Sequence, residues 1–237
     1  MAVLGLEDGS YVELVAPLKA GSATESSWSK FMLANAGPCA WAVGSDDIQK
    51  DADAIQRAGF AMDGPFPGGR KTPDGKTLEW QVAALATKPV GAVLPFIIQD
   101  RTPREWRVVP SASAATMGLV SVMAVVLAVK NLDAAIATFQ RAYGWPTPVL
   151  EDHPEFGAKL AHFASTPVIL AEPLGSDSWL AKRLSELGES PAAFFLNGPD
   201  FEKAAAKAKP AASLWFGRRI AWFDAGKIEG TRLGVLE

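Results

Sequence analysis

Residues 124–144, AVVLAVKNLDAAIATFQRAYG, place a strand, a helix cap and a helix in direct succession. The β-branched run from Ala124 to Val129 is typical of a buried strand, and Asn131 can cap the helix that follows. The apolar residues of this helix recur at helical spacing until Gly144, a residue type that commonly ends helices. They are Leu132, Ala135, Ile136, Phe139 and Tyr143. The stretch therefore predicts a strand followed by an amphipathic helix with one buried face.

The same succession occurs twice more. Residues 40–43 predict a strand, Ser45 a cap and residues 46–58 a helix, and a fainter copy has a strand at 192–196 and a helix at 201–208. Extended segments follow each helix: 77–84 and 93–99, then 157–164 and 168–172, then 214–223 and 231–237. The repeating unit is therefore a strand, a helix and two or three strands, at intervals of roughly 70–80 residues.

The chain begins with a predicted hairpin, whose strands at 2–6 and 11–16 are joined by Asp-Gly turn chemistry. Glu13 lies on an otherwise apolar face of the second strand. The remaining stretches predict a loop over 19–36 with a helical turn at 28–34, a connection over 100–113 and a helix over 178–187. We expect two lobes, residues 1–110 and 111–237, with two of the repeating modules in the second.

Composition excludes several classes of protein. The chain has 237 residues, 49% of them hydrophobic, and a net charge of -3, which favours neither nucleic acid nor anionic membranes as a partner. Its one cysteine, Cys39, cannot form an intrachain disulfide, so a cytoplasmic protein is expected. We find no export signal, and the longest apolar run, residues 117–129, is shorter than the ~20 residues that cross a bilayer.

Six local stretches resemble the vicinal oxygen chelate superfamily, and glyoxalase-like proteins in particular. They are VGSDD at 43–47, VKNLD at 129–133, DGSYVEL at 8–14, RKTPDG at 70–75 with LEW at 78–80, LPFII at 94–98 and GTRLGVLE at 230–237. The resemblance implies an α+β fold in which βαβββ modules pair into half-open barrels. The chain starts at what resembles the third strand of a module, so the first module is expected to be truncated.

In that superfamily a divalent metal is typically held by a His from the first strand and a Glu from the last strand of each module. The carried-over last-strand positions are Glu172 and Glu237, but the first-strand positions are Ala124 and Ala193, which cannot bind a metal. In the first lobe the corresponding residues are Glu13 and Gln99. The carboxylates are therefore present and the expected histidines are absent.

The two histidines receive different interpretations. His162 shares a face with Leu160 and is expected to point inward, either as a hydrogen-bonded histidine of the core or cavity or as a metal ligand beside Glu172 and Glu237. His153 is expected in an exposed turn. For Glu237 two alternatives stay open: a raised pKa that makes it a general acid or base, or pairing with Arg219 or Arg232 at a sheet edge.

Eight tryptophans are a high number, and they suit either core packing or an aromatic lining for an apolar ligand. Gly68-Gly69-Arg70 predicts a hairpin turn, with Arg70 a candidate for binding a substrate carboxylate. The candidate substrate-binding residues are Trp145, Trp179, Trp222, Arg70 and Glu13.

The leading hypothesis is a protein that binds a small, partly apolar molecule in the barrel of the C-terminal lobe, without the usual two-His, two-Glu metal centre and without a cofactor. The alternative is a metal-dependent lyase, isomerase or dioxygenase with Glu172, Glu237 and His162 as catalytic residues and ligands of Mn, Fe, Zn or Ni. A homodimer, or another chain that supplies the missing strand, is a further alternative. Whether the protein is an enzyme stays open at this point.

Overall fold

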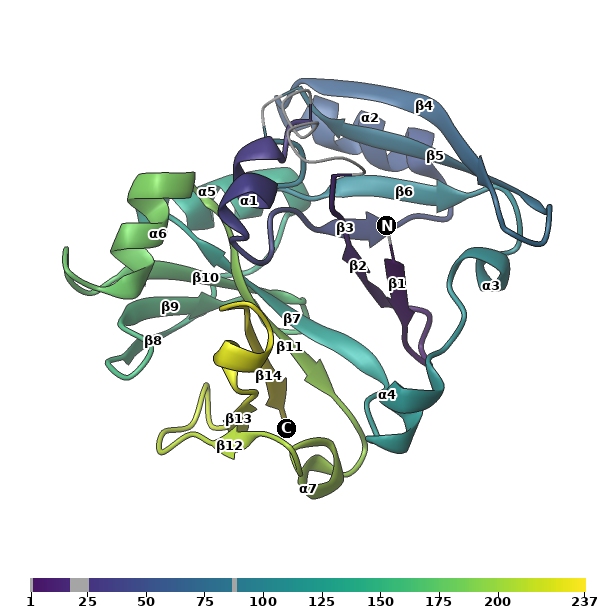
Figure 1. The fold of residues 1–237 in the computed structure, drawn as a ribbon. Coiled ribbons are helices and arrows are strands. Elements are labelled where there is room, and N and C mark those ends of the chain that lie inside the picture. Colours follow the sequence, from purple (N-terminus) through teal and green to yellow (C-terminus); the bar gives the residue numbers. More distant parts are fainter. Residues whose placement is uncertain (1, 18–25, 87–88) are drawn as a thin grey trace.

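The computed structural model describes residues 2–17, 26–86 and 89–237. The fold is α+β and contains three complete βαβββ modules, as the repeats predict (Figure 1). The first module comprises β3 (Ala42–Gly44), α2 (Ile48–Arg57), β4 (Met62–Lys71), β5 (Thr77–Leu85) and β6 (Phe96–Asp100). The second comprises β7 (Ser121–Ala128), α5 (Leu132–Tyr143), β8 (Val149–His153), β9 (Ala158–His162) and β10 (Val168–Pro173). The third comprises β11 (Ser190–Asn197), α7 (Phe201–Ala204), β12 (Lys209–Pro210), β13 (Ile220–Trp222) and β14 (Arg232–Leu236).

The strand order is the same in all three modules, because the first strand of each pairs in parallel with the last. The first module forms a sheet of its own, β3-β6-β5-β4. The other two join through antiparallel pairing of β7 with β11 into one eight-stranded sheet, β12-β13-β14-β11-β7-β10-β9-β8 (Figure 1).

The other elements connect or cover the modules. They are β1 (Ala2–Gly5), β2 (Tyr11–Leu14), α1 (Ser29–Ala34), α3 (Arg104–Arg107), α4 (Ala112–Thr116), α6 (Trp179–Leu187) and a 3-10 helix (Ala225–Lys227). Of the loop expected over 19–36, residues 19–25 lie outside the described residues, and α1 occupies the expected helical turn. No helix in the described ranges is long and apolar enough to cross a membrane.

Capping side chains define where the helices begin. Asn131 caps α5 by accepting a hydrogen bond from Ala134, and Gly144 ends α5 in the left-handed conformation (φ 67°), both as expected. The cap of α2 is Asp47, not Ser45. The Ser45 hydroxyl, which precedes the cap, instead donates to Asp51 in the first turn of α2 and so also stabilises the start of this helix.

Three strands were not predicted from the sequence: β4, β8 and the two-residue β12. Gly68-Gly69-Arg70 is not a turn but the middle of β4, paired with β5, and the turn lies near Gly75. A side chain at Gly68 would collide with the indole of Trp80, so glycine lets the two strands approach each other there. β8, at 149–153, pairs with β9 at one edge of the large sheet, and β12 pairs with β13 at the other edge.

Both faces of the eight-stranded sheet are covered. On one face, Leu127 and Leu170 of the sheet lie in a cluster with Phe139 of α5. The opposite face carries a second cluster, which we call the barrel core, closed over by α6. Its buried members are Ala124, Val126, Ala128, Phe156, Ala158, Leu160, Ile169, Ala171, Leu180, Leu184, Ala192, Ala193, Phe195, Trp215, Ile220 and Leu236. The interior of the C-terminal barrel is therefore filled with side chains, and a ligand there has to use its half-buried rim.

The β1–β2 hairpin packs on the C-terminal part of the chain. Leu6 is 1% exposed and lies in a cluster with Leu196 and Val235, and Leu4 and Val12 pack against the same cluster. Trp41 and Leu94 contribute in turn to the cluster around α5: residues of the first module therefore contact the second directly.

Candidate functional site

The last strand of a module helps to begin the helix of the same module. Glu172 lies near the end of β10, and its Oε2 accepts the N–H of Leu132, the first residue of α5, at 3.0 Å. Gln99 on β6 does the same for α2, with its Oε1 3.4 Å from the N–H of Ile48. Since the first N–H groups of a helix have no partner within it, these side chains satisfy donors that would otherwise be orphaned.

The alternation of side chains along β10 explains this role. Val168, Leu170 and Glu172 point to one face, and the first two pack against α5. Ile169 and Ala171, which alternate with them, belong to the barrel core. Glu172 therefore points toward α5 and away from the barrel interior.

Glu237 shares this orientation. Leu233 and Val235 pack in the cluster around α7, whereas Leu236 lies in the barrel core. Glu237 forms a two-pronged ion pair with Arg219, with both nitrogen–oxygen distances 2.9 Å. This pair lowers the pKa of Glu237, so the interpretation of a raised pKa is wrong and the pairing with Arg219 is the alternative that the structure has.

His162 lies on the other face from Glu172. Its half-buried ring is 5.3 Å from the ring of Phe216, and its Nε2 is 3.4 Å from the carbonyl oxygen of Thr166. Burial lowers its pKa. The structure thus does not bring His162, Glu172 and Glu237 together, and no group of three His, Cys, Asp or Glu side chains suited to a metal occurs among the residues that the structure describes.

The residues at the superfamily's ligand positions do not fit a divalent ion. The first strands place Ala124 and Ala193 in the barrel core. On the last strands Glu172 and Glu237 point away from the barrel, and the neighbours that face inward are Ala171 and Leu236. None of these inward-facing side chains has a lone pair to donate to a metal.

His153 is buried, at 3% exposure, so its prediction as an exposed turn residue is wrong. β8 carries it inward against Trp215, with the ring centroids 5.0 Å apart. Its Nδ1 accepts the N–H of Phe156 at 3.2 Å, which leaves the proton on Nε2 to be donated to Ser213, 3.0 Å away. Ser213 donates in turn to Glu155.

Two of the predicted tryptophans meet at the rim of the barrel core. Trp179 donates its indole N–H to the carbonyl oxygen of Phe156 at 2.7 Å, and Trp222 stacks on the Phe156 ring at 5.8 Å. Trp145 lies on the opposite face of the sheet, where it stacks on Phe139 and Tyr143. The structure therefore brings Trp179 and Trp222 together and leaves Trp145 apart from them.

Arg232 completes this rim, and the sequence analysis did not select it as a binding residue. Its guanidinium lies 3.9 Å from the ring centroid of Trp179 and 6.0 Å from that of Phe156. The sequence did contain an indication of this role. Alternation along β14 places Arg232 on the same face as Leu236, and Leu236 lies in the barrel core. We call Arg232, Trp179, Trp222, Phe156 and Trp215 the aromatic–arginine site.

Two donors of this site have no acceptor among the described residues. The ion pairs found there are Lys76–Asp74, Arg107–Asp100, Arg219–Glu202 and Arg219–Glu237, and Arg232 takes part in none of them. Burial lowers the pKa of the Arg232 guanidinium. The indole N–H of Trp215, which is fully buried, has no partner within the described ranges either.

Arg70 and Glu13 lie outside the eight-stranded sheet. Arg70 is exposed on β4 and paired with Leu78, and Glu13 is exposed on β2 and paired with Val3. Neither belongs to the aromatic–arginine site.

The three βαβββ modules, two of them sharing one sheet, place the protein in the vicinal oxygen chelate superfamily. The chain belongs to the family of the glyoxalase-like domain, whose model matches residues 1–125, more than half of the 237. No curated protein matches the sequence.

Several solved structures are similar over half of the chain. A Streptomyces coelicolor methylmalonyl-CoA epimerase variant in complex with 2-nitronate-propionyl-CoA is 21% identical over 50% of this chain and 96% of its own, with a TM-score of 0.42. The methylmalonyl-CoA epimerase of Mycobacterium tuberculosis is 18% identical over 51% of this chain and 89% of its own, with a TM-score of 0.43.

The capping role of Glu172 predicts a loss of stability. Replacing Glu172 with Ala removes the acceptor of the Leu132 N–H and should lower the free energy of unfolding by about 1 kcal/mol, measured by urea denaturation. Glu172→Gln should lose much less, because an amide oxygen accepts the same bond, as Gln99 does for α2. The exposed Glu186→Ala on α6 serves as a control. Equal losses for the Ala and Gln variants would contradict a capping role.

The buried histidine predicts a pH dependence of stability. Burial lowers the pKa of His153 below its ordinary 6.5, so the unfolded chain binds a proton before the folded chain does. Stability should be complete above about pH 6.5 and should decline as the pH falls below it. Urea denaturation between about pH 5.5 and 8 measures this decline. His153→Gln should make the free energy of unfolding less dependent on pH, because only the contribution of His162 then remains. An unchanged pH dependence in that variant would contradict the role of His153.

Proposed function

We propose that this protein binds a small, partly apolar molecule with an anionic oxygen group at the aromatic–arginine site, on the rim of the barrel in the C-terminal lobe. The observation that carries the proposal is the half-buried guanidinium of Arg232, stacked 3.9 Å over Trp179 without an ion pair among the described residues.

A guanidinium that is partly removed from water is stabilised by an anion that replaces the lost hydration. Arg232 takes part in no ion pair among the described residues, and its contacts with Trp179 and Phe156 are made to aromatic rings, so its N–H donors can serve a ligand. A carboxylate can accept two of these N–H groups side by side. The site is thus suited to an acidic ligand.

The aromatic neighbours supply the apolar part of the site. Trp179 and Trp222 are half-buried, and both contact Phe156, Trp179 edge-on and Trp222 by stacking. The unpartnered N–H of Trp215 in the same cluster adds a second donor for a ligand oxygen. A flat, apolar body with a carboxylate satisfies these groups together.

This proposal is for binding. The alternative of a metal-dependent lyase, isomerase or dioxygenase needs donors on the inner faces of β7, β10, β11 and β14. The barrel-core residues of these strands are apolar, and the charged residue beside them, Arg232, is a cation that does not bind a metal. We also propose that residues 1–110 and 111–237 are the two lobes of the protein.

The charge requirement can be tested with a matched pair of probes. 1-Naphthoate and its uncharged amide have the same apolar body and differ in the anionic group. Isothermal titration calorimetry should give about tenfold weaker binding of 1-naphthoate to Arg232→Gln than to the unaltered protein, with the amide bound weakly and equally by both. The exposed Arg57→Gln on α2 is the control. Equal naphthoate affinity with and without Arg232 would refute the site.

A metal titration separates the proposal from its alternative. A thermal melt with Mn²⁺, Fe²⁺, Zn²⁺ or Ni²⁺ should not shift, whereas a specific site at ~100 times its dissociation constant would add roughly 2.7 kcal/mol. A chelator-sensitive shift that disappears in Glu172→Gln would support the metal-dependent alternative instead.

A further inference from the structure

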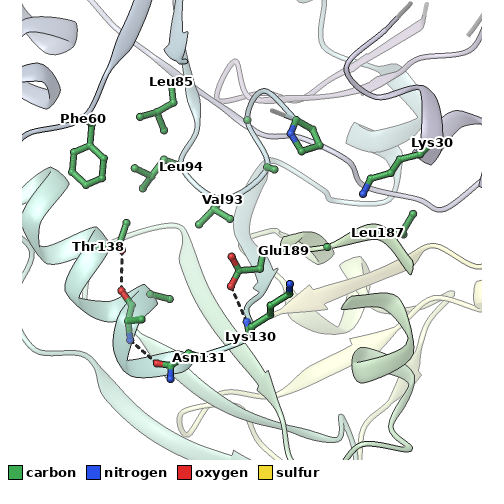
Figure 2. A pocket seen from close by; sticks show the side chains of 16 residues that line it. Lys30, Phe60, Leu85, Val93, Leu94, Lys130, Asn131, Thr138, Leu187 and Glu189 are labelled. Atoms are coloured by element: carbon green, nitrogen blue, oxygen red, sulfur yellow. Dashed lines mark hydrogen bonds between the residues drawn. The ribbon is translucent and has the colours of Figure 1, made fainter. Parts of the chain in front are cut away.

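A cavity of about 710 Å³ lies between the first and second modules (Figure 2). We call it the interlobe groove. The N-terminal lobe contributes Lys30, Phe60, Leu85 and residues 89 and 91–94. The C-terminal lobe contributes residues from 130 to 138 at the start of α5 and residues 187–189 at the end of α6. The aromatic–arginine site shares no residue with it.

One wall of the groove is apolar and is held in place by hydrogen bonds. Phe60, Leu85, Val93 and Leu94 lie along this wall in Figure 2. Two tryptophans hold the backbone of residues 90–93 in this wall. The indole N–H of Trp28 donates to the carbonyl oxygen of Val90, and that of Trp41 donates to the carbonyl oxygen of Val93, each at 2.9 Å. The wall is therefore formed before any ligand arrives.

The opposite side carries cationic groups. Figure 2 shows the ammonium of Lys30 turned toward the groove, with Lys130 across from it. Neither lysine takes part in the ion pairs found among the described residues. The lining has one carboxylate, Glu189, and one of its oxygens already accepts the backbone N–H of Lys130 at 2.8 Å. The lining therefore has a net positive charge.

The start of α5 contributes little to this charge. Two of its first N–H groups are already satisfied, that of Leu132 by Glu172 and that of Ala134 by Asn131. The lysines are thus the groups that can hold an anion in the groove.

We propose that the interlobe groove is a second binding site and takes an elongated amphipathic anion of the medium-chain carboxylate class. The chain lies along Phe60, Leu85 and Leu94, and the carboxylate lies between Lys30 and Lys130. The combination of a long apolar wall with charge at one end favours a carboxylate on a flexible chain over a compact polar anion.

The test uses octanoate and 1-octanol, which share a chain and differ in charge, with isothermal titration calorimetry as the readout. Replacing both Lys30 and Lys130 with Gln should weaken octanoate binding at least tenfold and leave 1-octanol unchanged. Ala134→Trp, an exposed lining position, fills the groove and should abolish binding of both probes. Thermal melts of each variant confirm that it folds.

Two controls locate the effect. Lys50→Gln, an exposed lysine of α2 outside the groove, should bind octanoate as the unaltered protein does. The same titrations are repeated in an Arg232→Gln background, where octanoate no longer binds at the aromatic–arginine site, and the effects of the lysine replacements and of Ala134→Trp should persist there. In that background, octanoate binding that survives both the double lysine replacement and Ala134→Trp would overturn the inference, as would the loss of all octanoate binding in Arg232→Gln alone.

Discussion

The antiparallel pairing of β7 with β11 determines which side chains of the second and third modules face inward. Its register sets Val126 opposite Ala193 and Ala124 opposite Phe195, and all four lie in the barrel core. Because side chains alternate along a strand, a shift of one residue would turn this set outward and bring its neighbours in. Each flanking strand takes its own orientation from β7 or β11 through parallel pairing. The content of the barrel thus follows from one strand pair.

This orientation separates the acidic residues from the barrel interior. The alternation that buries Ile169 and Ala171 turns Glu172 toward α5, where it satisfies a backbone donor at the helix start. Gln99 occupies the equivalent position and has the same function in the first module, although it carries no charge. A position that accepts either Glu or Gln requires an acceptor oxygen and not a negative charge. Helix capping explains this preference in both modules without reference to a ligand.

Local sequence patterns correctly predicted the structural features that depend on residues close together in the chain. The strand before α5, its Asn131 cap and its end at Gly144 are all encoded within residues 124–144, and the structure has each of them. The alternation of Glu172 with Val168 and Leu170 was also correct; what it could not show is that this face meets α5. The burial of His153 and the strand through Gly68 depend on partners, Trp215 and Trp80, that lie far along the chain.

The two proposed sites also differ in how far the sequence alone could indicate them. Alternation along β14 places Arg232 on the inner face, so the aromatic–arginine site was within reach of the sequence, and only its neighbour Trp179 had to come from elsewhere. The interlobe groove has no such signal, because Lys30, Phe60 and Lys130 come from separate elements and converge only when the first module packs on α5. A ligand of the proposed groove would contact the first and second modules at once, and it would therefore stabilise the packing of the one on the other by mass action.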